Sequence, residues 1–80
     1  MKNYLVIDII NIKQDGSKER SFNTFIKIKD AKNFIDSFGL LSGSKVLIAG
    51  ENLNPFINHL SSFTKSVLLD KSNKVLTLNF

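Results

Sequence analysis

The sequence predicts a two-layer α/β domain of the α+β type, in which a mixed five-stranded sheet carries two helices on one face. Stretches rich in β-branched and aromatic residues occur as a pair at each end of the chain, with a single stretch between the pairs. Two segments with apolar residues at helical spacing separate these groups, which gives the order ββαβαββ. Helical connections on either side of the central strand favour parallel neighbours, whereas each hairpin adds an antiparallel one.

The first hairpin is predicted from strands at 3–13 and 20–29, with Asp15 and Gly16 forming a two-residue turn. In that register Gln14 lies opposite Ser17 and Phe22 faces the core. The opposite face then presents a second, partly apolar set of side chains, namely Tyr4, Val6, Asp8, Ile10, Ile12, Phe25, Lys27 and Lys29.

The middle of the chain predicts a short helix at 30–38, with Asp30 as its N-cap and Gly39 in the left-handed conformation that ends it. A continuous apolar run at 45–49 is typical of a buried central strand. A second helix is predicted at 55–64, because Asn54 can cap it and Pro55 suits the first helical position.

The last two strands are predicted at 66–70 and 74–79, paired around a turn at Ser72 and Asn73 so that Leu69 faces Leu76. Two short helices can cover one face of the sheet only, so the other face meets water or a partner. The expected core comprises Leu5, Ile7, Ile9, Phe22, Ile26, Phe34, Ile35, Phe38, Val46, Ile48, Phe56, Leu60, Phe63, Val67, Leu69, Leu76 and Leu78.

The composition limits the class of protein. With 80 residues, a second core would leave each half near the ~40-residue floor for unaided folding, so residues 1–80 are expected to form one domain. The absence of cysteine excludes disulfides and thiolate metal sites and favours a cytoplasmic location. Asp8 and Asn11 interrupt the apolar N-terminal run, so we do not expect a signal peptide. No run approaches the ~20 residues of a membrane span, so we expect no membrane partner.

The titratable residues predict no enzyme. His59 is the only histidine and is expected on the solvent side of the second helix, outside any metal-ligand spacing. Asp8 lies in an apolar strand, where it either fixes the register or anchors a binding surface. No spacing brings Asp8 and Glu51 together, and Gly50 alone makes no phosphate loop. We therefore expect no catalytic residues, metal, cofactor or small-molecule substrate.

The remaining hypothesis is binding through the open face of the sheet. The candidate surface consists of Tyr4, Val6, Asp8, Ile10, Phe25, Lys27 and Lys29. A protein partner, either a host protein or a second copy of the chain, is the first interpretation. Single-stranded nucleic acid held by lysines with Tyr4 and Phe25 is the alternative, because the net charge is +4. The lysine- and asparagine-rich composition is typical of an A+T-rich genome, such as that of a phage or mobile element.

Overall fold

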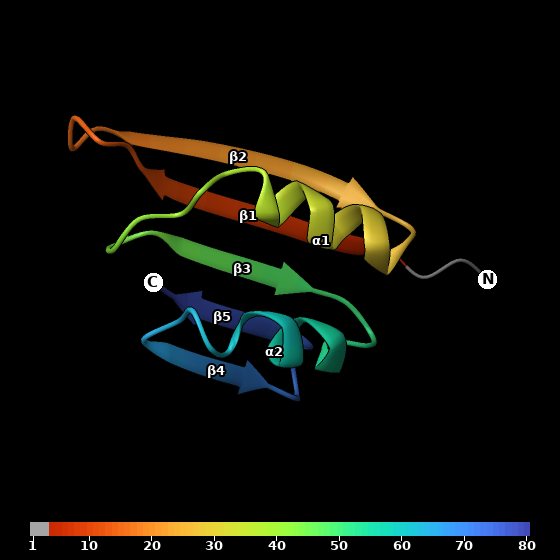
Figure 1. Ribbon diagram of the computed structural model, residues 1–80. Coiled ribbons are helices and arrows are strands. Elements are labelled where there is room, and N and C mark those ends of the chain that lie inside the picture. The colour runs from red at the N-terminus through yellow and green to blue at the C-terminus, as the bar shows by residue number, and fades with distance from the viewer. Residues whose placement is uncertain (1–3) are drawn as a thin grey trace.

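The computed structural model describes residues 4–80, which form five strands and two helices (Figure 1). In chain order these are β1 (Leu5–Ile12), β2 (Lys18–Phe25), α1 (Ile28–Asp36), β3 (Lys45–Ala49), α2 (Asn54–Leu60), β4 (Ser66–Asp70) and β5 (Val75–Asn79). The predicted class and the order ββαβαββ are confirmed, and β3 and β4 have their predicted bounds. Residue 3, predicted to begin the first strand, lies outside the described residues.

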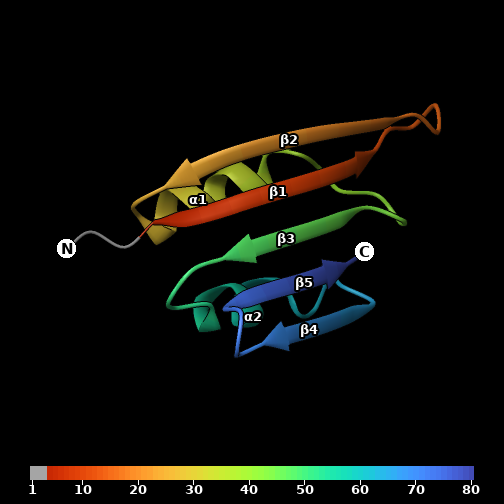
Figure 2. The same cartoon turned by 180° about the vertical axis from the view of Figure 1, so that it is seen from behind.

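The molecule has two layers. Both helices lie on one face of the sheet, and the opposite face carries no other element of the described chain (Figures 1 and 2). Side chains alternate between the faces of a strand, so every second residue points to the helices. Ile7 and Ile9 of β1 and Val46 and Ile48 of β3 point that way and are fully buried. The helices thus cover one apolar face and leave the second face open.

The strands are arranged in the order β2-β1-β3-β5-β4, and every neighbouring pair is antiparallel. The expectation of a mixed sheet is therefore wrong in this detail. Each helical connection does join two strands that run in the same direction, β2 to β3 and β3 to β4. In both cases, however, a strand of the adjacent hairpin lies between them, so the parallel strands are never neighbours.

The first hairpin has a register that differs from the predicted one. The Lys13 N–H donates to the Ser17 carbonyl over 2.8 Å, and the Gly16 N–H donates to the Lys13 carbonyl over 2.9 Å. Residues 14–16 therefore form a three-residue loop, and the φ of 86° at Gly16 is the left-handed conformation that closes such a loop. As a result Leu5 lies opposite Phe25, one position away from the predicted partner.

This one-residue difference moves every side chain of β2 to the other face. Phe22 is opposite Asp8 and 65% exposed, so its predicted place in the core is wrong. Phe25 packs on the helix side, where its ring centroid lies 5.1 Å from that of Phe34. The predicted place of Phe25 on the open face is wrong for the same reason.

The second hairpin has the predicted register. Leu69 lies opposite Leu76, and Leu68 lies opposite Thr77. Leu76 and Leu78 of β5 are fully buried, because β5 lies between β3 and β4 under the helices. The Asp70 carboxylate accepts from the Asn73 backbone N–H and side-chain amide over 3.1 and 2.9 Å, which closes the connecting turn.

Both helices begin earlier than predicted, and neither has a side-chain cap. Helix α1 starts after Lys27, which leaves Asp30 in its first turn rather than at the N-cap. Helix α2 starts after Leu53 and ends at Leu60, so Asn54 is its first residue and residues 61–64 lie outside it. Gly39 has the predicted left-handed conformation, with a φ of 56°.

Most of the predicted core is buried or packs against buried residues, apart from four positions on which the prediction was wrong: Phe22, Ile26, Phe63 and Val67. Ile26 and Phe63 follow the ends of β2 and α2, where the chain leaves the sheet and helix layers, and Val67 lies on an edge strand. Ser44 is an unpredicted buried residue. Its hydroxyl oxygen accepts the Ile12 N–H over 2.9 Å and so joins β1 to the start of β3.

Candidate functional site

The candidate site is the open face of the sheet, the face that no helix covers. Its central row crosses all five strands through Phe22, Asp8, Leu47, Thr77 and Leu68, each opposite the next. The two ends of this row project furthest, because Phe22 is 65% and Leu68 is 66% exposed. The middle of the row is half-buried.

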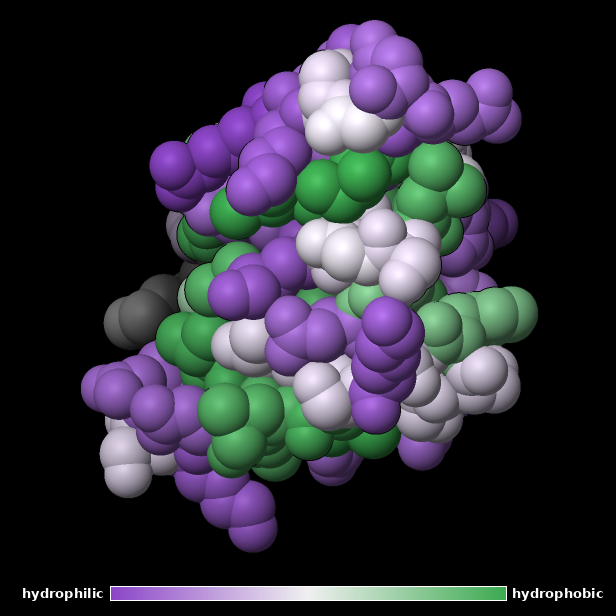
Figure 3. Space-filling view, turned by 90° about the vertical axis from the view of Figure 1, so that its left-hand side faces the viewer, coloured by the Kyte–Doolittle hydropathy of each residue, from purple (hydrophilic) through white to green (hydrophobic). Residues whose placement is uncertain are grey.

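Aliphatic residues border the central row and make the face continuous. Val6 and Ile10 precede and follow Asp8 in the outward set of β1, and Ala49 and Val75 lie beside Val6 on the neighbouring strands. All four are half-buried. An end view shows hydrophobic residues at the surface among hydrophilic ones (Figure 3). Exposed apolar side chains that gather on one face of a protein are a feature of contact sites.

One carboxylate interrupts the apolar row, and it is paired. The Arg20 Nε donates to one oxygen of Asp8 over 3.0 Å and Nη2 donates to the other over 2.8 Å. This bidentate geometry is the one that guanidinium and carboxylate groups favour. The hydrogen bond to Asp8 raises the pKa of Arg20 above its usual value, with the charge of Asp8 as the second cause. Arg20 therefore stays charged beside the apolar surface.

The two ends of the open face differ in charge. Arg20 and Lys45 lie on either side of Ile10, and Lys18 lies opposite Ile12, so these cations gather at one end. All three side chains are exposed. At the other end the only charged residue of the five-strand register is Asp70, whose carboxylate is bound within its turn.

The structure brings together only part of the predicted binding surface. Val6, Asp8 and Ile10 lie on the open face as predicted. Phe25 lies on the helix side, and the exposed Lys27 and Lys29 belong to the start of α1 rather than to a strand. Tyr4 precedes β1 and is 56% exposed at the end of the sheet.

The face contains residues that the sequence analysis missed, above all Phe22, Leu47 and Leu68. The pairing of Asp8 with Arg20 could have predicted the outward position of Phe22, because it requires the register in which Phe22 lies opposite Asp8. In the predicted register Asp8 and Arg20 lie on opposite faces, whereas the observed register places them diagonally on one face, within reach of each other. A lone carboxylate in an apolar strand needs a partner, and Arg20 is the only arginine of the chain.

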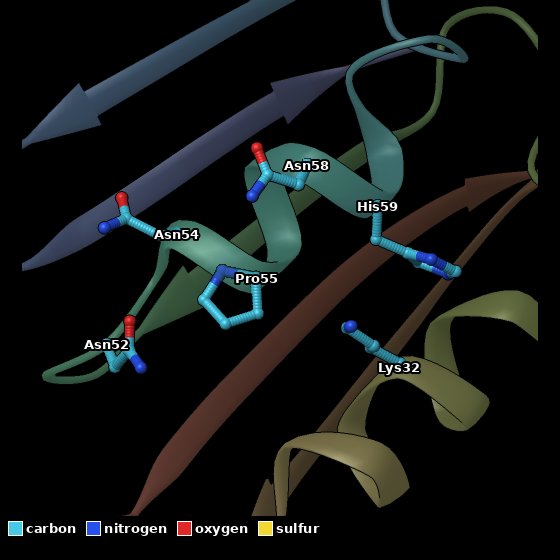
Figure 4. Close-up of a pocket in the computed structure, with 6 residues that line it drawn as sticks. All are labelled: Lys32, Asn52, Asn54, Pro55, Asn58 and His59. Carbon is cyan, nitrogen blue, oxygen red and sulfur yellow. The ribbon is translucent and has the colours of Figure 1, made fainter.

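A polar hollow lies on the helix side and is lined by Lys32, Asn52, Asn54, Pro55, Asn58 and His59, with a volume of about 650 Å³. It is wide open to solvent. Lys32 extends from α1 toward α2, and His59 extends from α2 toward α1 (Figure 4). These groups can hydrogen-bond a polar molecule.

His59 connects the two helices rather than pointing to solvent. Its Nε2 lies 3.0 and 2.9 Å from the two Asp36 carboxylate oxygens. Both oxygens converge on one ring nitrogen, so this nitrogen is committed to the contact. The predicted surface position is therefore correct only in part, because 34% of the His59 side chain is accessible while its ring is engaged with Asp36. The contact has a structural explanation.

Within residues 4–80 the histidine and acidic side chains form no group of three that could hold a metal ion. None of the helices that the structure describes has the length and apolar character needed to cross a membrane. Comparisons with protein-family models, curated proteins and solved structures gave no match.

Proposed function

We propose that the chain is a non-enzymatic binding protein whose open face docks onto an apolar, acid-rimmed surface of another protein. The observation that carries this proposal is the central row from Phe22 to Leu68. Two exposed apolar side chains flank a half-buried middle across the full width of the sheet. Buried aromatic and aliphatic anchors of this kind supply most of the energy of protein interfaces.

The charge distribution favours an acidic partner. Lys18, Arg20 and Lys45 make one end of the face cationic, and carboxylates opposite them would steer and orient the complex. The net charge of +4 acts in the same direction over longer distances.

A second copy of the chain fits this face less well. If two faces packed about a two-fold axis parallel to the strands and centred on β3, Lys45 would lie opposite itself. Like charges that face each other are destabilising. If the axis ran across the strands at the central row, the two Asp8–Arg20 ion pairs would meet, and burying them would cost solvation energy. The open face therefore matches a foreign acidic surface better than its own copy.

The size of the face suits a reversible complex. Five strands spaced ~4.8 Å apart, each five to eight residues long at ~3.3 Å per residue, cover roughly 400–600 Å². A standard interface takes about 800 Å² from each partner. We therefore expect affinity to depend on a few anchors, Phe22 first among them.

Single-stranded nucleic acid is the weaker alternative. It needs aromatic rings on which bases stack. Phe25 lies on the helix side, so Phe22 is the one aromatic residue within the five-strand register of the open face. A cationic end with a single ring offers phosphate contacts but little stacking.

Site-specific photo-crosslinking tests the proposal. A benzoyl-phenylalanine replaces Phe22 in one variant and Phe63 in a control, in the cells that produce the chain. The two phenylalanines match in exposure, 65% and 71%, but Phe63 follows α2 and lies beside Ile35 and Leu60 on the helix side. We expect one discrete protein adduct from position 22 and none from position 63.

The adduct is then identified by mass spectrometry and its purified protein is titrated with the chain. We expect Phe22→Ala to weaken this binding at least tenfold and Phe63→Ala to leave it unchanged. A nucleic-acid adduct at position 22, or a protein whose affinity does not depend on Phe22, would overturn the proposal.

A further inference from the structure

The two edge strands of the sheet, β2 and β4, differ in how well charged residues protect them from pairing with another strand. Exposed edge strands present unpaired backbone groups, and proteins usually shield them with charge. The edge strand β2 begins with Lys18, Glu19 and Arg20. In β4 the only charged residue is Asp70 at its end, and the exposed Val67 and Leu68 make up its middle. No other element of residues 4–80 lies beyond β4 (Figures 1 and 2).

The hydrogen-bond pattern shows which backbone groups of β4 are free. Gly50 donates to the Lys74 carbonyl and Phe80 donates to the Ser44 carbonyl, so the even-numbered residues of β5 bond toward β3. Backbone groups alternate in direction along an antiparallel strand, and the odd-numbered residues of β5 therefore bond to β4. Their partners are Ser66, Leu68 and Asp70. Val67 and Leu69 consequently direct their N–H and C=O groups away from the sheet.

We propose that two copies of the chain pair antiparallel through β4, with the two-fold axis at Leu68. This residue is the centre of the five-residue strand, so the pairing places Val67 opposite Leu69 of the second copy and Ser66 opposite Asp70. The outward groups of Val67 and Leu69 then form the interchain hydrogen bonds. The two Leu68 side chains meet at a pair without hydrogen bonds, where Cα atoms approach to ~4.5 Å.

Charge and packing agree with this register. Leu68 is 66% exposed and would cover its own copy, and no two like charges face each other between residues 66 and 70. Just outside the strand, Lys71 would lie opposite Lys65 of the second copy; both side chains are exposed, so solvent and salt screen this repulsion, and the Lys65 ammonium is directed to the Ser42 hydroxyl over 3.1 Å. The two open faces then become one surface across ten strands, and the charged β2 edges end the assembly as a closed dimer. This inference rests on the backbone groups of the edge and on Leu68, and it does not require the partner proposed for the open face.

Cysteine cross-linking tests the register of the proposed β4–β4 pairing. The chain has no cysteine of its own, so only the introduced cysteines can form disulfides. We expect Leu68→Cys to form a disulfide-linked dimer rapidly under mild oxidation, since its Cα distance suits a disulfide. Ser66→Cys is the matched control, because Ser66 is also exposed but lies about 14 Å from its own copy in this register. It should remain monomeric alone and cross-link when mixed with the Asp70→Cys chain.

Sedimentation of the unmodified chain supplies a second measurement. We expect a reversible dimer at concentrations up to about 1 mM, a range that reveals weak association. Val67→Pro should abolish it, because it removes an outward N–H and leaves the bonds to β5 in place, whereas Val67→Thr should preserve it. If Val67→Pro does not fold, the cross-linking of the cysteine variants still tests the pairing through β4. Equal cross-linking of Leu68→Cys and Ser66→Cys, or a wild-type monomer at every concentration, would overturn the pairing.

Discussion

Two phenylalanines three residues apart on β2 have opposite environments. Phe25 packs at a ring-centroid distance of 5.1 Å from Phe34, which in turn lies 5.0 Å from Phe38 in an edge-to-face arrangement. Aromatic pairs of this geometry stabilise a fold beyond their buried area. Phe22 projects from the other face with 65% of its surface exposed. Phe25 therefore contributes to stability, and Phe22 is available for contacts.

Truncation of each ring measures this difference. We expect Phe25→Ala to lower the free energy of unfolding by about 2–3 kcal/mol, less than the ~3–5 kcal/mol of a fully buried phenylalanine, because the ring is half-buried. Phe22→Ala should change it by no more than about 0.5 kcal/mol. Urea denaturation followed by circular dichroism gives both values. The reverse ranking would contradict the observed register of the first hairpin.

At the scale of the element, the loop between β1 and β2 sets the position of every residue on β2. Its hydrogen bonds run between Lys13 and Ser17 and between Gly16 and Lys13. The Asp15 carboxylate accepts from the Ser17 N–H over 2.9 Å and thereby braces the loop. Gly16 closes it with a φ of 86°. The loop is thus specified by a short run of polar residues and a single glycine.

Substitution of Gly16 tests the conformation of this loop. A Cβ at Gly16 would meet open space, so the cost of Gly16→Ala comes from the positive φ alone. We expect a loss of about 1–2 kcal/mol in the free energy of unfolding. Gly16→Asn should lose less, because asparagine tolerates the left-handed conformation. Equal stability of the alanine variant and the wild type in thermal or urea unfolding would exclude the left-handed loop.

At the scale of the whole molecule, two turn carboxylates make stability depend on pH. Hydrogen bonds from the Ser17 side chain and backbone lower the pKa of Asp15, and those from the Asn73 backbone and side chain lower that of Asp70, both from an ordinary 3.8. The Asp15 and Asp70 carboxylates therefore bind protons less tightly in the folded state than in the unfolded state. The stabilisation is complete above pH 3.8 and disappears as the pH falls through the lower folded values.

The double variant Asp15→Asn, Asp70→Asn isolates this contribution. It should be less stable than the wild type at pH 7, and the difference should shrink as the pH falls below 3.8. Thermal melts between pH 7 and pH 2 measure it. A difference that stays constant over this range would show that the two carboxylates do not act through ionisation.

Local patterns in the sequence determined the elements of this protein and one of its two hairpin registers. A turn at Ser72 and Asn73 predicted the pairing of residues 66–70 with 75–79, in which Leu69 and Leu76 both face the helices. The apolar run at 45–49 predicted a central strand, because a strand flanked on both sides and covered by helices carries few polar residues. These patterns predicted the two layers, the open face and the positions of Val6, Asp8 and Ile10 on that face.

Only the tertiary structure decided the first register and the order of the strands. A two-residue and a three-residue loop around Asp15 and Gly16 both satisfy local turn preferences, so contacts distant in sequence select between them. These are the packing of Phe25 on Phe34 and the pairing of Arg20 with Asp8. The strand order likewise depends on β1 and β5 each pairing with β3 across a long separation in sequence. The residues that complete the candidate site, Phe22 and Leu68, share one face and one row through these nonlocal contacts.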